Sequence, residues 1–246
     1  TQIGDKLDAM DFKPFTGVDV AAIEALSLAA RSDKYHVKAI KPLPRRKLYE
    51  KVPLMDCFTA PCKGGCPIQQ DIPEYIELCR KGEYASALRL ITEKNPLPFI
   101  TGTICAHNCM TKCMRNYYDQ PVNIRSTKLV AAEKGYDAYM AKIKAPAPAD
   151  TSAKVAVIGG GPTGMSAAYF LGRAGIPVTI FERTDCLGGV VRQVIPAWRI
   201  SDDAIDKDVA LMFKMGVEVK LNTEAPSVAE LKAMGYTHIF FAVGAW

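Results

Sequence analysis

Six of the eight cysteines stand in two tight groups, and thiols at such spacing are typical of metal ligands. The members of the first group are separated by four and then three residues, and those of the second by three and three. The groups are Cys57, Cys62 and Cys66, and Cys105, Cys109 and Cys113. No basic and apolar leader opens the chain, so we expect a cytoplasmic protein whose reduced thiols bind metal rather than form disulfides.

The spacing of the second group separates its thiols by about one helical turn. We therefore expect Cys105, Cys109 and Cys113 to lie on one helical or near-helical stripe. A stripe of buried thiols without metal is the structural alternative, because free cysteine packs like a small hydrophobic residue. The two remaining cysteines, Cys79 within a predicted helix and Cys186 in a predicted loop, are interpreted as packing or incidental thiols.

The spacing of the thiols suits iron and sulfide better than zinc. Zinc sites use paired C-x2–4-C ligands in a closed tetrahedron, and neither group supplies two such pairs. Iron–sulfur sites accept more varied spacings, and one ferredoxin pattern ends in Cys-Pro, as Cys66-Pro67 does. A radical enzyme that cleaves S-adenosylmethionine is a weaker alternative, because its C-x3-C-x2-C spacing differs by one residue from that of the second group.

A second chemical signal is the glycine-rich turn in KVAVIGGGPTGM, residues 154–165. Gly159-x-Gly161-x-x-Gly164 follows a predicted strand and opens a predicted helix, and Glu182 stands 18 residues later at the end of VTIFE. A dinucleotide-binding βαβ unit requires this context. We expect Gly159 to allow the tight turn, Gly161 to let pyrophosphate approach the backbone, and Gly164 to allow close packing. Glu182 would accept hydrogen bonds from ribose hydroxyls, and the helix beginning near Pro162 would present N–H groups to phosphate.

The motif alone does not choose between FAD and a nicotinamide nucleotide. Gly188-Gly189, soon after Glu182, and Ala242-Val243-Gly244, at the end of a later predicted strand, favour the flavin form. No second G-x-G-x-x-G follows in the sequence, so we expect no separate nicotinamide domain within it.

The pattern around these motifs predicts two parts of different class. Helical patterns dominate before residue 143, and strands alternate with helices after residue 154, as in a parallel α/β sheet. Asp71 and Glu74 predict a capping box at one helix start. The expected helices are 20–30, 71–82, 84–93, 123–142, 162–174, 203–215 and 228–234, and the expected strands are 154–158, 178–181, 217–221 and 238–243.

Length and composition are those of an ordinary globular protein. The chain has 246 residues, of which 49% are hydrophobic and 23% charged, and its apolar runs are far shorter than a membrane span. The net charge is only +5, and aromatic residues do not alternate with the basic ones, so the composition argues against nucleic-acid binding. The basic segment 38–47 is interpreted as an exposed linker, with docking of an acidic partner as the alternative. Because the chain begins with Thr1 and stops after a strand-like run, we expect a piece of a longer protein.

Together, the thiol-rich helical segment and the glycine turn resemble the small subunit of glutamate synthase and the N-terminal half of dihydropyrimidine dehydrogenase. The stretches that carry the resemblance, over residues 50–246, are DCFTAPCKGGCP, DIPEYIELCRKGEYASALRLITEKNPLP, TGTICAHNCMTKC, VNIRSTK, VAVIGGGPTGMSAAYFLGRAGIPVTIFER, GGVVRQVIPAWRI and FFAVGA. In that family, electrons pass from NAD(P)H through FAD and two [4Fe–4S] clusters to a separate catalytic domain or subunit.

The resemblance implies an α+β multidomain fold, in which an all-α domain of the alpha-helical ferredoxin type precedes part of a Rossmann-like α/β FAD-binding domain. The implied boundaries are an extension at 1–50, the iron–sulfur domain at 51–142, a linker at 143–153 and the partial FAD domain at 154–246. The implied FAD contacts comprise the phosphate loop, the ribose ligand, the following loop, an arginine near the flavin and a residue from the cluster domain. They are Gly159, Gly161, Pro162, Thr163, Gly164, Glu182, Gly188, Gly189, Val190, Arg199 and Ile104.

The resemblance also divides the six thiols between two clusters. One set is Cys57, Cys62 and Cys113, and the other is Cys66, Cys105 and Cys109. Each set lacks a fourth ligand, because the family's first cysteine corresponds to Leu54 and its carboxylate or glutamine to Lys128, whose ammonium has no free lone pair. Asp56 and His107 are alternative donors, and an incomplete or three-iron cluster also fits. The departures most resemble the branch described as the iron–sulfur subunit of a selenate reductase.

We expect an electron-transfer subunit in which FAD accepts hydride from NAD(P)H and passes single electrons through iron–sulfur centres to a catalytic partner. No catalytic acid, base or nucleophile is assigned in this chain. A non-catalytic docking module, with zinc or no metal among its thiols, is the alternative from another functional class.

Anaerobically purified protein is therefore expected to contain iron and acid-labile sulfide and to lose a brown colour in air. Iron, sulfide, zinc and released-flavin assays on one preparation measure this. Stoichiometric zinc without sulfide would instead support the docking module.

Overall fold

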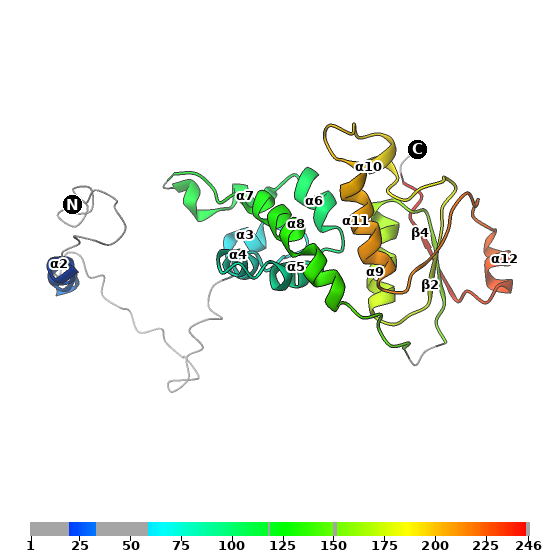
Figure 1. Ribbon diagram of the computed structural model, residues 1–246, viewed down its shortest axis with the longest axis horizontal. Helices are drawn as coiled ribbons and strands as arrows, with labels where there is room; N and C mark the ends of the chain where they lie inside the picture. The colour runs from blue at the N-terminus through cyan, green and yellow to red at the C-terminus, as the bar shows by residue number, and fades with distance from the viewer. Residues whose placement is uncertain (1–19, 33–58, 118, 150–151, 245–246) are drawn as a thin grey trace, which may run out of the picture. The chain divides into compact units, whose positions relative to one another are not determined.

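The computed structural model describes residues 20–32, 59–117, 119–149 and 152–244 (Figure 1). The chain divides into two compact units, residues 1–55 and 56–246. The described element of the first unit is α2 (Val20–Ser32), which confirms the helix expected at 20–30. The rest of the expected extension at 1–50 lies outside the described residues. Among the helices that are described, none has both the length and the apolar character of a membrane span.

Residues 59–142 are helical, as expected. Two predicted helices agree with the structure to within one residue, at 84–93 and 123–142. The short helices α3, α6 and α7 were not predicted, because fewer than eight residues are too few to show an apolar period. The elements are α3 (Pro61–Gly64), α4 (Ile72–Arg80), α5 (Tyr84–Thr92), α6 (Pro98–Ile104), α7 (Asn108–Thr111), the 3₁₀ helix η1 (Met114–Tyr117) and α8 (Ile124–Lys142).

The capping box expected at the start of α4 is wrong. The Asp71 side chain makes no cap hydrogen bond to that helix. Its carboxylate pairs with the Lys63 ammonium and with Nζ of Lys94 at 2.7 Å. Two nearby cations therefore compete successfully with the backbone N–H groups, a contact that sequence spacing does not reveal.

The helical stripe expected for the second cysteine group is also wrong. Cys105 ends α6 with φ −57° and ψ 139°, which is an extended conformation. Cys109 lies in α7, and Cys113 follows that helix. His107, between the first two thiols, has a left-handed φ of 47°, so the chain turns sharply instead of continuing one helix.

The helix α8 is the centre of the helical segment and packs against α4, α5 and α6. It buries small residues, which allow close approach to its neighbours. One buried cluster joins α4, α5 and α8, and a second joins α5, α6 and α8. The clusters are Ile72, Tyr75, Ala87, Ile91, Ile124 and Ala131, and Leu88, Phe99 and Ala132.

Residues 154–244 form the expected α/β segment, and all four predicted strands are present. The sheet is parallel, with the order β3-β2-β1-β4. The strand order reverses at β1, so β2 and β4 lie on either side of the strand that leads into the glycine turn. The elements are β1 (Val155–Ile158), α9 (Pro162–Arg173), β2 (Val178–Phe181), α10 (Val190–Gln193), α11 (Asp202–Phe213), β3 (Glu218–Lys220), α12 (Val228–Ala233) and β4 (His238–Phe241).

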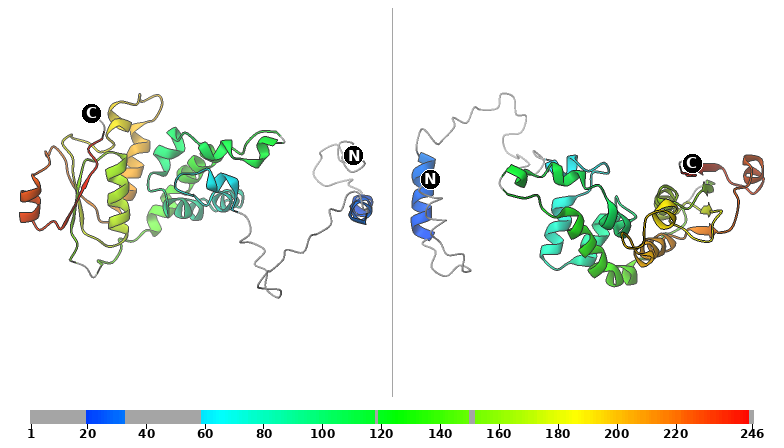
Figure 2. Two further views of the ribbon diagram at one scale, coloured as in Figure 1. Left: turned by 180° about the vertical axis from the view of Figure 1, so that it is seen from behind. Right: turned by 90° about the horizontal axis from the view of Figure 1, so that it is seen from above.

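Helices cover both faces of this sheet, and β1 is buried on both. Val155 and Val157 belong to the core that contains Met165 of α9, whereas Ala156 and Ile158 pack with Leu231 of α12. Figure 2 shows α12 on the side of the sheet opposite α9 and α11. The continuous apolar sequence of β1 follows from this burial, as in other parallel sheets.

The helical and α/β segments share one hydrophobic core. Leu97 and Ile100 of the helical segment are 5% and 3% exposed and belong to the same buried cluster as Tyr169 and Met212. The helix α6 packs along α11, as the ribbon shows (Figure 1). The two segments are therefore packed together within residues 56–246, while the boundaries expected at 51 and 143–153 stay predictions.

Gly135 in α8 should be intolerant of a side chain. A Cβ at this position would lie 2.6 Å from the carbonyl carbon of Tyr84 and 2.9 Å from the amide nitrogen of Ala85. Both are backbone atoms in the first turn of α5. Gly135→Ala is expected to destabilise the fold by about 1–3 kcal/mol through overpacking, measured by urea unfolding. Gly64→Ala is the matched control, because nothing lies within 4 Å of a Cβ there. Equal stability of the two variants would contradict the close packing.

Candidate functional site

The thiols gather where α3, α6 and α7 meet. Cys62 lies in α3 and Cys66 follows that helix. In the second group, Cys105 follows α6, Cys109 lies in α7 and Cys113 immediately precedes η1. A Cβ on Gly65 would lie 3.3 Å from the Cα of Cys109, so the two cysteine segments touch there. The described thiols in this region are half-buried and form no disulfide, and Cys57 lies outside the described residues.

Electrostatic contacts divide the described thiols into two sets. Burial raises the pKa of the Cys109 thiol, and the neighbouring Cys66 and Cys105 raise it further. Burial also raises the pKa of Cys62, with a further contribution from Cys113. Cys62 thus interacts with Cys113, and Cys109 with Cys66 and Cys105, while Cys57 of the first set lies outside the described residues; the division of the thiols between two clusters stays a prediction.

The loop after Cys105 is held by polar contacts. The backbone N–H of His107 donates to Sγ of Cys105 at 3.4 Å. Nη1 of Arg125, at the start of α8, donates to the carbonyl oxygen of Cys105 at 3.2 Å and lies 3.3 Å from Nδ1 of His107. The imidazole is therefore engaged with the backbone of Cys105 and the guanidinium, and Arg125 places a positive charge beside the thiol segment.

Lys128 is a buried cation that faces the Cys66, Cys105 and Cys109 set. Its residue is 7% exposed, on the helix turn after Arg125. Burial lowers the pKa of Lys128, while the three thiols and Asp208 oppose that shift. Sequence reasoning identified this position as a departure from the family and expected Lys112, Arg125 and Lys128 to lie near the clusters and raise their reduction potentials, but it did not predict that Lys128 would be buried.

These residues fit an iron–sulfur group in their donor chemistry. Three half-buried thiols supply soft sulfur donors, and the buried Lys128 and half-buried Arg125 can compensate the negative charge of thiolates and sulfide. Among the residues that the structure describes, no group of three or more His, Cys, Asp or Glu side chains is arranged to hold a single metal ion. Cys57 of the first set and the alternative donor Asp56 lie outside those residues.

A cavity of about 430 Å³ opens at the carboxyl ends of β1, β2 and β4. The glycine turn and the start of α9 form one wall, and Gly189, Val190 and Gln193 form another. The loop 223–225 after β3 and residues 242–244 after β4 close the remaining sides. Ligands of open α/β sheets bind in this crevice beside the strand at which the order reverses.

The three glycines of the turn are in the geometry expected of them. Gly159 has φ of 105°, and a Cβ there would lie 2.9 Å from the carbonyl carbon of Ala242. A Cβ on Gly164 would lie 3.2 Å from Val157, so the helix packs closely on β1. At Gly161 the nearest protein atom to a Cβ is 3.9 Å away, on a residue lining the cavity, so the backbone here is open to a ligand.

Glu182 lies at the end of β2, is 8% exposed and lines the cavity. Its carboxylate accepts the N–H of Gly160 at 2.6 Å and both the N–H and the hydroxyl of Thr184 at 2.9 Å. Burial alone would raise the pKa of Glu182, but these hydrogen bonds outweigh burial and lower it. The carboxylate stabilises the fold above the ordinary glutamate pKa, and the contribution is lost as the pH falls through the lowered value.

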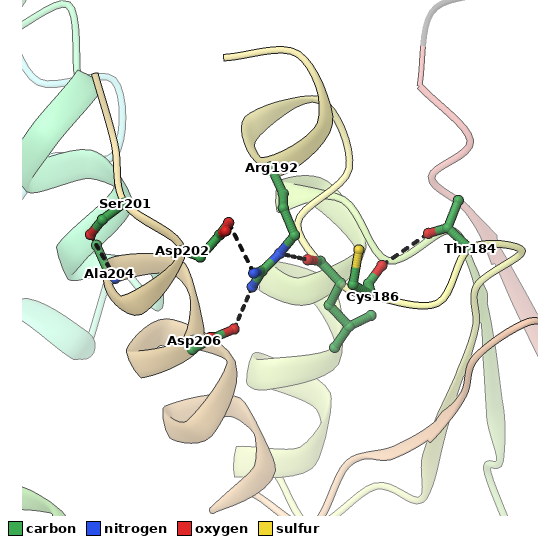
Figure 3. A network of polar contacts seen from close by, with 8 residues as sticks. Thr184, Cys186, Arg192, Ser201, Asp202, Ala204 and Asp206 are labelled. Carbon is green, nitrogen blue, oxygen red and sulfur yellow. Dashed lines mark hydrogen bonds and ion pairs between the residues drawn. The ribbon is translucent and has the colours of Figure 1, made fainter. Parts of the chain in front are cut away.

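The loop that follows Glu182 is anchored to α11 through Arg192 (Figure 3). Nε of Arg192 donates to the carbonyl oxygen of Leu187 at 2.7 Å, and its Nη atoms pair with Asp202 at 3.1 Å and with Asp206. Oγ1 of Thr184 also lies 3.0 Å from the carbonyl oxygen of Cys186, so its one hydrogen is shared between this oxygen and the Glu182 carboxylate. These contacts hold the Gly188-Gly189 turn next to the cavity.

Most of the predicted nucleotide residues line the cavity, and four do not. Gly164 packs on β1. The backbone N–H of Gly188 donates to the carbonyl oxygen of Gly160, and neither residue lines the cavity. Arg199 is exposed, and Ile104 packs against the core shared with the helical segment. Residues 223–225, Thr184 and Gln193 line the cavity but were not predicted; their position after β3 or in the loop after β2 was the only available signal.

A second cavity, of about 470 Å³, lies away from the glycine turn and the thiols. It is formed by α5, the end of α8, the following linker and α9. Basic side chains are prominent in its lining, including Arg89, Lys142, Lys144 and Arg173. No residue predicted to act in metal or nucleotide binding contributes to it.

Comparison with known proteins relates each segment to a described family. Residues 48–139 match the family described as dihydropyrimidine dehydrogenase domain II, 4Fe-4S cluster. Residues 157–216 match the family described as NAD(P)-binding Rossmann-like domain. The two matches cover the thiol-rich helices and the glycine-turn segment, and they agree with the sequence-based prediction of fold class.

Full-length relatives are considerably longer than this chain. YgfK of Escherichia coli, described only as an oxidoreductase, is 42% identical over 97% of this chain and 23% of that protein. The NADPH-Fe(3+) oxidoreductase subunit beta of Geobacter sulfurreducens is 34% identical over 78% and 29%, respectively. The NADPH glutamate synthase small chain of Mycobacterium tuberculosis is 33% identical over 78% and 39%. The chain thus spans less than two-fifths of each relative.

Glu182→Ala is expected to weaken FAD binding by about 1–3 kcal/mol, because the ribose hydroxyls would lose a charged acceptor. Fluorescence titration with FAD measures the change. Glu182→Gln keeps one acceptor oxygen and should lose less, whereas Glu133→Ala on the exposed face of α8 should have no effect. Undiminished FAD affinity in both Glu182 variants would refute the predicted role.

Proposed function

We propose an electron-transfer role for this chain, whose residues 48–139 match the 4Fe-4S family of dihydropyrimidine dehydrogenase domain II and whose residues 157–216 match the NAD(P)-binding Rossmann-like domains. In the proposal, FAD occupies the cavity at the glycine turn and the cysteine sets hold iron–sulfur clusters. The finding that carries it is the packing of a thiol-bearing helical segment against the α/β segment that contains this cavity, within one compact unit.

The nucleotide half of the proposal rests on the cavity. The N-terminus of α9 and the open backbone at Gly161 suit a pyrophosphate, and Glu182 suits the ribose of an adenosine. FAD is favoured over a nicotinamide nucleotide in this cavity because the Gly188-Gly189 turn and residues 242–244 stand where the sequence pattern of flavin domains has them. Bound FAD would accept two electrons as a hydride and release them one at a time to iron–sulfur centres.

The route between the two centres rests on α6. This helix runs from Pro98 to Ile104 and is followed directly by Cys105. Ile100 and Ile104 belong to the same apolar core as Val191 of α10, and α10 begins next to the cavity-lining Gly189. In the proposal, electrons pass between the cavity and the thiols along α6 and this shared core.

Positive charge beside the thiols should set the potential of the proposed clusters. Arg125 contacts the segment of Cys105, and Lys128 is buried against the second set. A cluster becomes more negative when reduced, so nearby cations favour the reduced state and raise the reduction potential. In this proposal the centres accept electrons readily from the flavin.

The source and destination of the electrons lie outside this chain in the proposal. NAD(P)H would donate hydride, and a catalytic oxidoreductase domain or subunit would receive the electrons, as the names of the relatives from Geobacter and Mycobacterium suggest. A cytoplasmic location is part of the same proposal, supported by cysteine spacing that suits reduced thiols.

Single cysteine substitutions test the proposed division of ligands. Cys66→Ser and Cys109→Ser are expected to abolish the same cluster signal in electron paramagnetic resonance of the reduced, anaerobically prepared protein. Cys62→Ser should abolish a different signal. Cys186→Ser is the control that should retain both signals, because Cys186 lies in the loop between β2 and α10, outside the helical segment. Loss of different signals in the Cys66 and Cys109 variants would contradict the division.

A further inference from the structure

Asp208 of α11 is the most deeply buried charged side chain among the described residues, and it faces the helical segment. The residue is 0% exposed. Its two carboxylate oxygens accept the backbone N–H groups of Phe99 at 3.1 Å and Ile100 at 2.8 Å. These N–H groups belong to the first turn of α6, where no partner exists within the helix. A residue of the α/β segment thus caps the helix that leads to Cys105.

No residue next to α6 in the sequence performs this task. Leu97 at the N-cap position has no side-chain acceptor, and the Oδ1 of Asn95 is used by the N–H of Leu97 at 3.2 Å. Without Asp208, two N–H groups in a buried environment would lack an acceptor, which is costly. The seating of α6 on the α/β segment therefore depends on a residue more than one hundred positions away.

Aromatic and cationic contacts surround the carboxylate. The rings of Phe99 and Tyr136 meet edge to face at 5.4 Å, and the hydroxyl of Tyr136 donates to the carbonyl oxygen of Lys207 at 3.4 Å. Nζ of Lys207 lies 5.4 Å from the centre of the Phe99 ring. Helices α6, α8 and α11 thus meet around Asp208, and the contact excludes water.

Asp208 also interacts with the buried cation at the thiols. Burial raises the pKa of Asp208 to about 8, while the two N–H donors and Lys128 act in the opposite direction. Lys128 in turn faces Cys105, Cys66 and Cys109. Lys128 of α8 is therefore within electrostatic reach of both Asp208 and the second set of thiols.

We propose that Asp208 is a positioning residue for electron transfer, which fixes the end of α6 that carries Ile104 and Cys105 relative to the nucleotide cavity. The helix has seven residues, a length of about 10 Å, so a change in its first turn displaces its last. The redox consequence of this inference rests on the proposed function. The capping contact itself is independent of that function.

The test compares Asp208→Asn with Asp203→Asn. Asparagine keeps the shape but offers one acceptor oxygen for two N–H groups. Asp203 lies on the same helix, and its side chain is 74% exposed and paired with Lys207, so its loss should change little. Hydrogen exchange of the Phe99 and Ile100 amides should accelerate about tenfold or more in the Asp208 variant alone, because a buried N–H group would be left without a full acceptor.

The second measurement separates positioning from capping alone. In protein reconstituted anaerobically with iron and sulfide, Asp208→Asn should change the electron paramagnetic resonance signal and potential of the cluster that Cys66→Ser abolishes, and leave the other cluster unchanged. Faster exchange with both clusters unchanged would overturn the inference, as would unchanged exchange. If Asp208→Asn does not fold, Asp208→Glu, which keeps the charge but displaces the oxygens, provides the same comparison.

The cluster content of the unsubstituted protein distinguishes failure of this inference from failure of the proposed function. Absence of iron and sulfide after reconstitution of the unsubstituted chain would overturn both the electron-transfer role and the redox part of this inference. Normal cluster content with identical signals in the Asp208 and Asp203 variants would overturn only the positioning role.

Discussion

The contact between α6 and α11 is the constraint on which the rest of the described architecture depends. Apolar side chains of Leu97 and Ile100 enter the core of the α/β segment, and the first turn of α6 is completed by a carboxylate from α11. Burial of apolar surface alone is not directional, whereas two hydrogen bonds to one carboxylate fix an orientation. The combination explains how two segments of different structural class pack as one unit.

The charged side chains at the two candidate sites are of opposite sign. Around the thiols, Arg125 and Lys128 provide cations close to groups that become negative on ligating metal. At the cavity, backbone and hydroxyl donors keep the Glu182 carboxylate ionised. A positive environment suits electron-accepting clusters, and a negative one suits recognition of ribose hydroxyls. Each site thus has the charge that its proposed occupant requires.

Periodic elements and the glycine turn were predictable because local sequence specifies them. The strands at 154–158 and 178–181, the helix at 162–174 and the long helix α8 all follow from apolar patterning. The short helices around the thiols, the pairing of Asp71 with Lys63 and Lys94, and the break at His107 were missed. These features depend on partners distant in sequence or on one strained residue, and neither leaves a periodic signal.

By itself, the sequence determined the chemistry available to this protein: two groups of thiols, a dinucleotide-type turn and the carboxylate of Glu182 at its required spacing. Only the tertiary structure decided which thiols lie together, that Lys128 is buried against one set, and that Asp208 completes α6. The physical reason is that side-chain types and local periods are properties of short segments. Burial, shared charge and capping across segments exist only when distant parts of the chain pack together.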